Sequence, residues 1–361
     1  MSEHKSVDFF LGANTASGFR SYLNTYDEPQ AEFKRFLIKG GPGTGKSGMM
    51  KKLSAALEKA DSGWIEKIHC SSDADSLDGL IWEQGKAAVF DATPPHAVEP
   101  CFPGAYDRVI ALTECFDNSR LAENLGQIRC LSEKIAMLHQ RCRGLLAAAQ
   151  MLSQQNSAQL SEYWQVGKLH RSVERFAKRL LYKQHGDGSA DTVRMLSAVT
   201  DKGIITYEKT VSALADRIIC IKDPYGVVAD AYLDVIYRQA KKQGIKCTVC
   251  RGVLFPDRIE HLIMPEVRIA VVREDQLCRF SFDKMQIIHI SRYLLQKPFK
   301  SLKSVLRHRN HMIADLLKDA SGCLKQAKSL HDTLEGYYTP AVDFGKVDRI
   351  TETMIAAFME K

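Results

Sequence analysis

The sequence lacks any long hydrophobic run: no apolar stretch approaches the roughly 18 residues that a membrane-spanning helix needs. Its first eight residues, Met1–Asp8, also lack the basic region followed by an apolar run that marks a secretory signal. These absences argue against a membrane protein. We therefore expect a cytoplasmic protein with no membrane partner.

Long Pro, Gly or Ser tracts are absent too, which argues against a disordered or linker-rich chain. Hydrophobic residues make up 45% and charged residues 26% of the 361 positions, close to the globular average. A chain of this length is expected to form two domains, each with its own hydrophobic core.

The ten cysteines show no framework of regular spacings, which excludes a disulfide-stapled fold and predicts reduced thiols. Cys247-x-x-Cys250 stands alone, without a second Cys or His pair at ligand spacing, so we do not assign a metal to it. The net charge of +7 is mild. Most of the excess positive charge lies between Asp117 and His185, a segment with 11 Lys and Arg but only 5 Asp and Glu.

One glycine-rich segment dominates the first half. The apolar stretch Arg35–Lys39 predicts a short buried strand, and a helix is expected from about Ser47 onward. Between them the chain fits the pattern G-x-x-x-x-G-K-[ST]. The residues of the pattern are Gly40, Gly41, Pro42, Gly43, Thr44, Gly45, Lys46 and Ser47.

This pattern predicts a nucleoside triphosphate site, with ATP and Mg²⁺ as ligands. Glycines let backbone N–H groups converge on phosphate oxygens, and the helix N-terminus adds partial positive charge. Lys46 is expected to reach the β- and γ-phosphates, and the Ser47 hydroxyl to bind Mg²⁺. Asp91, which ends the apolar run Lys86–Asp91, is the candidate second magnesium ligand. A simple turn residue is the alternative for Asp91.

Two further segments could face the γ-phosphate. The polar turn after Ile65–Cys70 holds Asp73, Asp75 and Asp78, which could orient a water or accept a proton; capping of the next helix is the alternative. His96 follows Asp91 closely and is a further candidate, with a solvated loop histidine as its alternative.

The sequence contains an internal repeat that covers both halves of the chain. Leu, Ala, Thr, Gly and Tyr recur at one separation when Leu11–Tyr22 is set beside Leu196–Tyr207. In this comparison Gly40–Ser47 becomes Asp223–Asp230, with Ala229 in place of Lys46. Asp91 becomes Arg273, and Cys70 meets Cys250. The second half is therefore expected to bind no triphosphate, although Arg273 could instead reach the first site as an arginine finger.

Each half ends in a helical stretch. Positions Ile128, Ile135, Cys142 and Ala149, beside Leu131, Leu138, Leu145 and Leu152, form a heptad seam. A return helix carries Val166, Leu169, Val173, Phe176 and Leu180. We predict an antiparallel hairpin of these two helices, turning near Ser153–Ser161, and an analogous arm after Ser301, where Leu334–Tyr338 resembles Leu160–Trp164.

The first arm is basic, and two accounts of this charge remain open: a solvated helix face, and contacts to the phosphates of a nucleic acid. The residues are Arg141, Arg143, Lys168, Arg171, Arg175, Lys178, Arg179 and Lys183. The arms could also contact a protein partner or a second copy of the chain.

Several of these segments resemble an uncharacterised bacterial family of tandem P-loop ATP-binding proteins. They are Phe9–Phe19, Lys39–Ser47, His69–Asp73 with Ser76–Gly79, Asp91–His96, and Leu330–Pro340 with Asp343-Phe344. The resemblance implies ATP binding and hydrolysis, but no substrate or pathway. In that family the second half can carry its own phosphate loop, which is missing here.

The sequence thus predicts an α/β protein of two tandem P-loop-like domains, the second degenerate. The expected division is a nucleotide domain at 1–116, a helical arm at 117–190, a repeat at 191–296 and a second arm at 297–361. We expect a slow Mg²⁺-dependent ATPase or ATP-driven switch, because Ala92 follows Asp91 where many ATPases have an acidic base. A phosphotransferase acting on a small hydroxyl substrate and a non-hydrolysing ATP sensor with a nucleic-acid-binding arm are the alternatives.

Overall fold

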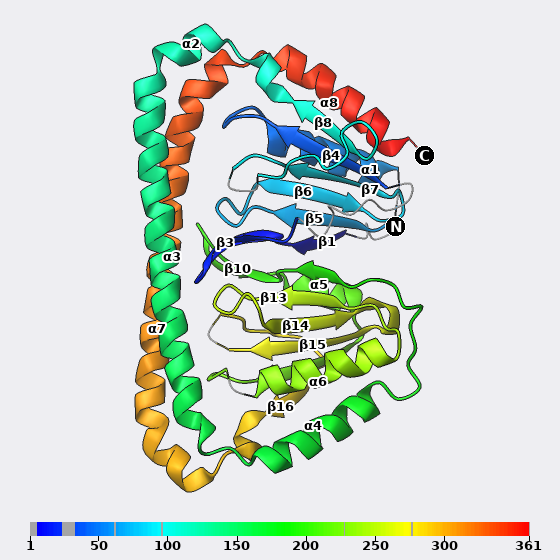
Figure 1. Ribbon diagram of the computed structural model, residues 1–361, viewed down its shortest axis with the longest axis vertical. Helices are drawn as coiled ribbons and strands as arrows, with labels where there is room; N and C mark the ends of the chain where they lie inside the picture. Colours follow the sequence, from blue (N-terminus) through cyan, green and yellow to red (C-terminus); the bar gives the residue numbers. More distant parts are fainter. Residues whose placement is uncertain are drawn as a thin grey trace.

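The computed structural model describes residues 6–23, 33–60, 63–94, 97–226, 228–275 and 277–360, with the backbone alone at 296–298. These residues form two six-stranded sheets, which lie one above the other in Figure 1. A pair of long helices runs past both sheets. The chain is therefore α/β with two sheet-bearing halves, as the sequence predicts.

The first sheet has the strand order β1-β5-β6-β7-β4-β8. Strand β6 is antiparallel to its neighbours, and every other pair is parallel. The strands are β1 (Ser6–Phe9), β4 (Lys34–Lys39), β5 (Ile65–His69), β6 (Leu77–Trp82), β7 (Ala87–Asp91) and β8 (Asp107–Ala111). Helix α1 (Lys46–Lys59) packs its buried Met50, Leu53 and Leu57 on one face of this sheet, beside Phe36 and Ile38 of β4.

The second sheet repeats this order as β9-β13-β14-β15-β12-β16, with β14 as the antiparallel strand. The strands are β9 (Thr192–Arg194), β12 (Arg217–Lys222), β13 (Thr248–Arg251), β14 (Ile259–Met264), β15 (Ile269–Glu274) and β16 (Gln286–His289). Its helices are α5 (Glu208–Leu214), α6 (Ala229–Lys242) and the short 3-10 turn η3 (Pro265–Val267).

Strand register makes the two halves equivalent residue by residue. Ile38 of β4 lies opposite Asp91 and Ile110, and Ile221 of β12 lies opposite Arg273 and Ile288. The predicted exchange of Asp91 for Arg273 is thus a real structural correspondence. The match of Cys70 with Cys250 is wrong. Both sheets have a bulge at the equivalent point, so His69 corresponds to Arg251, and Cys70 therefore corresponds to Gly252.

One of the contacts between the halves joins a pair of equivalent residues. Phe10 and Met195 exchange two backbone hydrogen bonds, with N···O distances of 2.9 and 2.8 Å. Each precedes a small hairpin, and both residues are fully buried. The hairpins are β2 (Gly12–Thr15) with β3 (Gly18–Ser21), and β10 (Ser197–Thr200) with β11 (Gly203–Thr206). A reciprocal contact between equivalents is what a pseudo-two-fold arrangement produces.

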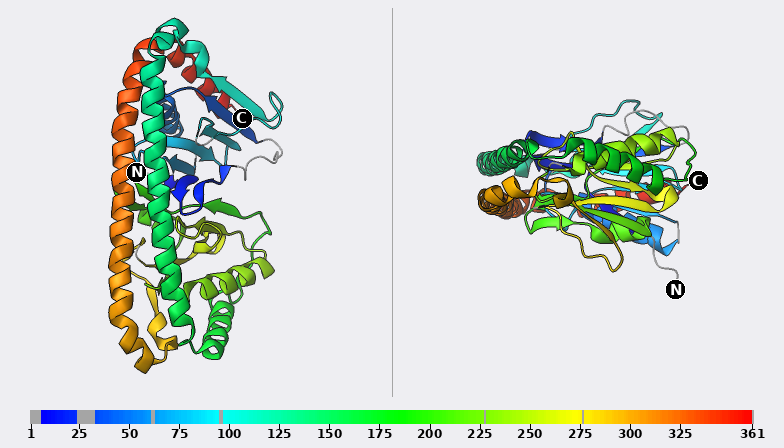
Figure 2. Two further views of the ribbon diagram at one scale, coloured as in Figure 1. Left: turned by 60° about the vertical axis from the view of Figure 1, so that its left-hand side comes forward. Right: turned by 90° about the horizontal axis from the view of Figure 1, so that it is seen from below.

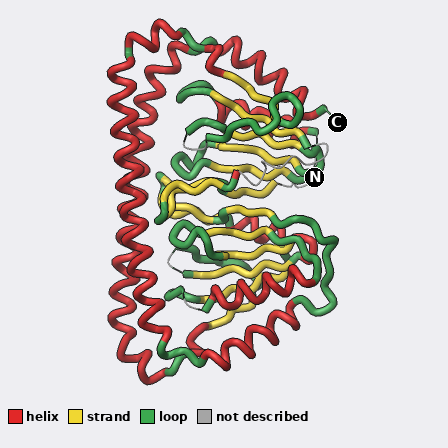
Figure 3. The backbone as a smooth tube through the Cα atoms, viewed as in Figure 1, coloured by secondary structure: helices red, strands yellow, loops and turns green. Residues whose placement is uncertain are grey.

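The two long helices are α3 (Leu125–Ser161) and α7 (Gln296–Tyr338), and α2 (Asn118–Glu123) precedes the first. They run antiparallel along one side of the molecule, side by side in Figure 2 and red in Figure 3. Cys142 and Ala149 of the predicted seam are buried between the helices and the sheets. Asn156 also lies buried, and its Nδ2 donates to Asn310 Oδ1 at 3.0 Å. Such a polar pair fixes the register of packed helices.

The predicted hairpin is wrong in its pairing. Helix α3 packs along α7, while α4 (Val166–Leu180) turns away and packs on α6 of the second half. A heptad seam specifies that a helix has a partner but not which helix that is, so the sequence could not choose between α4 and α7.

None of the helices that the structure describes offers an apolar stretch suited to spanning a lipid bilayer.

The helical segments cross between the halves. Helix α3 leaves the first sheet through η2 (Leu112–Cys115) and ends at α4 on the second half; α7 leaves through η4 (Ile290–Tyr293) and ends, after η5 (Thr339–Ala341), at α8 (Phe344–Met359) on the first half. Phe116 forms a β-bridge with Val342, and Trp164 forms one with Leu294. Phe116 is therefore equivalent to Leu294 and Trp164 to Val342, and the residues of each equivalent pair are 178 positions apart.

This separation corrects a third expectation. Leu160 corresponds to Tyr338 and not to Leu334, so the sequence comparison of the two arms was displaced by four residues. Four residues are about one helical turn, and a shift of that size keeps the same side chains on the same face. The pattern of apolar positions alone therefore could not reveal it.

Candidate functional site

The Gly40–Ser47 loop joins β4 to α1. Gly43 and Gly45 have φ values of 66° and 81°, in the left-handed region where side chains are disfavoured, and Gly45 caps the helix. The Thr44 hydroxyl donates to the Gly41 carbonyl at 2.8 Å and closes the turn. The glycines thus serve the backbone path, which brings the loop to the N-terminus of α1.

Lys46 lies across the loop that precedes it. Its Nζ donates to the carbonyls of Gly41 at 2.8 Å and Gly40 at 3.3 Å, and it lies 3.7 Å from Oδ2 of Asp91. Burial raises the pKa of Asp91, while Lys46 and the donors of Thr93 oppose that rise. The structure thus brings the predicted lysine and the predicted carboxylate together.

Ser47 faces the antiparallel strand of the sheet. Its Oγ accepts a hydrogen bond from the backbone N of Leu77, the first residue of β6, at 3.0 Å. The next residue, Asp78, is buried in β6. Lys46 and Ser47 therefore contact two different strands, β7 and β6, that lie next to each other in the sheet.

The other sequence candidates divide. Asp73 accepts from Ser76 Oγ at 2.9 Å and from the backbone N of Asp75 at 3.2 Å, both within the turn itself. The helix-capping alternative is wrong, because strand β6 and not a helix follows this turn. Asp73 also forms an ion pair with Lys328 of α7 at 3.4 Å, and Asp75 pairs with Lys202 of the second half. His96 lies outside the described residues.

Sequence reasoning missed a carboxylate from the far end of the chain. Glu335 of α7 accepts a hydrogen bond from the backbone N of Gly43, with Oε1 at 3.1 Å. His331, with Nε2 3.5 Å from the same oxygen, holds the pKa of Glu335 below its usual value, so the group remains a carboxylate. An anionic oxygen from the chain itself thus lies on the glycine loop.

Phe116, together with residues at the end of α7 and in its following turn, also leaves little room for side chains at two of the loop glycines. A Cβ at Gly41 would lie 3.0 Å from Tyr338 and 3.1 Å from Phe116, and a Cβ at Gly43 would lie 2.8 Å from Thr339 Oγ1. No local signal marks these contacts, because Glu335 and Tyr338 lie almost 300 residues beyond the loop.

The equivalent loop of the second half is filled from within. Asp223 stands at the position of Gly40, and its carboxylate accepts from the backbone N of Gly226 at 3.0 Å, Val228 at 2.7 Å and Ala229 at 2.9 Å. Asp223 is fully buried. The amide groups that a phosphate would need are therefore already occupied by a fixed anion.

Arg273 completes this substitution. It is 7% exposed on its side chain and pairs with Asp275 at 2.9 Å and Asp230 at 3.4 Å. Burial by itself lowers the pKa of Arg273, but the surrounding carboxylates, Asp223 among them, raise it above its ordinary value. The arginine-finger expectation is wrong, because this guanidinium is held inside its own half.

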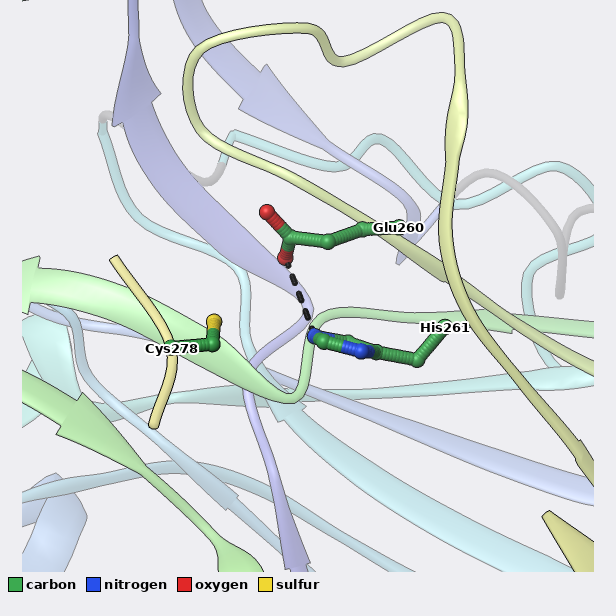
Figure 4. Close-up of side chains that lie close together, drawn as sticks. All are labelled: Glu260, His261 and Cys278. Carbon is green, nitrogen blue, oxygen red and sulfur yellow. Dashed lines mark ion pairs between the residues drawn. The ribbon is translucent and has the colours of Figure 1, made fainter. Parts of the chain in front are cut away.

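A buried trio in the second half, Glu260, His261 and Cys278, has the spacing of a metal site (Figure 4). His261 Nδ1 accepts from the backbone N of Arg273 at 3.1 Å, so the ring proton of the neutral form is on Nε2, which faces Glu260 at 3.4 Å. Burial raises the pKa of Cys278 well above its usual value. A protonated nitrogen and a thiol are poor ligands, so the trio does not fit a metal ion.

Comparisons of the chain with family models, with curated proteins and with solved structures found no match. We therefore infer function from the geometry of the Gly40–Ser47 loop.

Proposed function

We propose that the first half is a P-loop nucleotide-binding domain that takes ATP with Mg²⁺ at Gly40–Ser47, and that the second half is a degenerate copy. The observation that carries the proposal is the strand–loop–helix unit itself. Its left-handed Gly43 and Gly45 stand beside a lysine, Lys46, that lies 3.7 Å from the strand-terminal Asp91. This combination of backbone amides, ammonium group and carboxylate is what a phosphate chain with a magnesium ion requires.

Each side chain has a role in this proposal. Lys46 would leave the carbonyls of Gly40 and Gly41 and neutralise phosphate oxygens. Ser47 and Asp91 would hold Mg²⁺, since a hydroxyl and a carboxylate are hard oxygen ligands of the kind that this ion prefers. Gly43 N donates a hydrogen bond to a Glu335 carboxylate oxygen, which supports the loop as an anion site.

A nucleotide would compete with Glu335 for the loop. Because Glu335 belongs to α7, its displacement would break a contact between the loop and a helix that runs the length of both halves. This supports the ATP-driven switch, with slow hydrolysis resetting it, over a free-standing phosphotransferase. The substrate-dependent kinase and the pure ATP sensor remain outcomes of the test.

The test is a titration of purified protein with labelled ATP and MgCl₂, followed by a phosphate-release assay. Lys46→Ala should weaken ATP binding by about tenfold to a hundredfold, the range for loss of a charged hydrogen bond. Lys51→Ala is the matched control, since Lys51 is exposed on the same helix. Release without an acceptor supports the ATPase; release only with an added metabolite indicates a kinase; binding alone indicates a sensor. Absence of saturable ATP binding would refute the proposal.

A further inference from the structure

Helix α4 is strongly amphipathic. Its buried face, Leu169, Val173, Phe176, Ala177 and Leu180, joins the core of the second half. Its outer face carries exposed cations at helical spacing. These cations are Lys168, Arg171, Arg175, Lys178 and Arg179. Glu174 is the one acidic residue of the helix. The positive charge is thus organised into a stripe.

The tertiary structure adds a sixth cation from a distant part of the chain. Arg292 of η4 lies with Arg175 and Arg179 along a hollow of about 440 Å³ between α4 and the edge strand β16. Ser172 and Gln286 supply further polar groups to its lining, and none of the described residues that line it is acidic. Figure 1 shows α4 and β16 side by side at the lower end of the molecule.

The three arginines are not neutralised. Within the described ranges, none of them forms an ion pair with a carboxylate. Arg175 Nε donates to the Arg171 carbonyl, Arg179 lies over the Phe176 ring at 5.8 Å, and Arg292 lies over the Tyr293 ring at 5.0 Å. These contacts orient the guanidinium groups and leave most of their N–H donors for an external anion.

The first half provides an internal comparison, because α8 occupies the place of α4 there. Backbone hydrogen bonds fix the correspondence: Gln165 N donates to Tyr293 O, and Asp343 N donates to Cys115 O. At this separation Arg175 corresponds to Thr353, Lys178 to Ala356, Arg179 to Ala357 and Arg292 to Glu114. Lys168 and Arg171 correspond to Lys346 and Arg349, so these two cations occur in both halves. The other four are replaced in the first half, so the three arginines of the hollow are particular to the second half.

From these observations we propose that the α4 stripe with Arg292 binds the phosphodiester backbone of a nucleic acid. The stripe from Lys168 to Arg179 extends over about 17 Å at the helical rise per residue, and a nucleic-acid strand presents about five phosphates over that length. A single phosphate would use one or two of the cations. Tyr182, 67% exposed just beyond the helix, offers a ring on which a base can stack.

The five cations of α4 and Arg292 of η4 form one surface. Arg141 and Arg143 do not belong to it. Both lie on α3, and Arg143 donates to Asn14 Oδ1 at 3.4 Å. Lys183 lies just beyond α4, with its Nζ over the Tyr182 ring at 5.4 Å. The eight basic residues that the sequence suggested therefore separate into the five cations of α4, the two arginines of α3, and Lys183. The structure retains Lys168, Arg171, Arg175, Lys178 and Arg179 for the nucleic acid and adds Arg292.

The experiment measures fluorescence anisotropy of labelled 20-nucleotide DNA and RNA strands with the full chain, without ATP, over a range of salt concentrations. The triple variant Arg175→Ser, Arg179→Ser, Arg292→Ser should lower affinity at least tenfold. It should also reduce the slope of log K against log salt by about 2, since three phosphate contacts contribute roughly 0.7 each. The corresponding triple Lys variant should keep most of the slope.

The control Arg129→Ser, Lys134→Ser, Arg141→Ser removes the same charge from exposed positions of α3 and should change affinity by less than about twofold. Lys46→Ala should bind the strands as the wild type does, which separates this proposal from that of the nucleotide site. An equal loss of strand affinity in the Arg175, Arg179, Arg292 serine variant and in the α3 control variant would overturn the proposal. So would binding of poly-glutamate as tight as that of the strands, or full competition by low-millimolar inorganic phosphate.

Discussion

Glu335 Oε1 lies 3.1 Å from the backbone N of Gly43 and joins the end of α7 to the glycine loop. The second half contains the equivalent contact, because Ser157 of α3 donates its hydroxyl to the carbonyl of Gly226 at 3.0 Å. Each long helix thus contacts the loop of one half near its own C-terminal end. The first contact carries a negative charge and the second does not.

Replacing Glu335 should strengthen nucleotide binding. Glu335→Ala removes a carboxylate that occupies the loop and would repel phosphate, and we expect ATP affinity to rise about tenfold, from the 1.5–3 kcal/mol typical of a hydrogen bond to a charged group. Equilibrium titration with labelled ATP and MgCl₂ measures this change. Asp332→Ala, one turn earlier and exposed on the same helix, is the control and should have little effect. Unchanged or weaker binding in Glu335→Ala would count against displacement of Glu335 by the nucleotide.

Gly43→Ala should disrupt the loop. The residue has a φ of 66°, and an added Cβ would lie 2.8 Å from Thr339 Oγ1. We expect a loss of about 1–2 kcal/mol in the free energy of unfolding, the cost of a left-handed backbone with a side chain, together with a loss of ATP binding. Gly48→Ala is the matched control: it has open space around its Cβ and a helical position, so urea denaturation should find it unchanged or slightly more stable. A fully stable, ATP-binding Gly43→Ala protein would contradict this prediction.

The ligand-free protein should respond to pH through Asp91. Burial raises the pKa of Asp91 above its unfolded-state value, so the fold favours the neutral carboxyl. This contribution to stability is full below the unfolded pKa and is lost as the pH rises through the folded pKa. Asp91→Asn, which is neutral throughout, should therefore be at least as stable as the wild type at pH 7 in thermal denaturation without nucleotide. A clear loss of stability at pH 7 would show that the carboxylate form is structurally required.

The same group should govern the magnesium dependence of ATP binding. Only the ionised carboxylate can bind Mg²⁺, so the affinity of the wild type should fall on acidification, beginning at a higher pH than an ordinary aspartate would give. Asp91→Asn should bind ATP with little dependence on MgCl₂ or on pH in this range. Asp348→Asn, an exposed carboxylate on α8, should keep the wild-type dependence. Titrations at several pH values with and without MgCl₂ distinguish these cases.

Asp223→Ala should destabilise the second half. Its carboxylate accepts from Gly226, Val228 and Ala229 in a buried loop, and its loss leaves those amides and the nearby Arg273 without that anion. We expect a cost of about 3 kcal/mol in urea denaturation, as for one member of a buried charged network. Asp234→Ala, exposed on α6, should cost little. Near-wild-type stability of Asp223→Ala would mean that water replaces the carboxylate at no cost.

Much of the local structure could be predicted because it depends on neighbouring residues. The glycines of the loop specify a backbone with left-handed angles, and the apolar run before it specifies a strand. The heptads of α3 specify a long helix, in which Cys142 and Ala149 of the predicted seam are buried. The repeat of Leu11–Tyr22 at Leu196–Tyr207 indicated two similar halves, and the sheets have one strand order.

Only the tertiary structure decided which distant segments meet. It paired α3 with α7, placed Glu335 on Gly43, and set Arg292 beside the cations of α4. Periodicity and loop chemistry describe each segment's own surface, but many partners can satisfy the same apolar stripe or the same charge. The choice among them depends on where the chain crosses between the halves, which is a property of the whole fold.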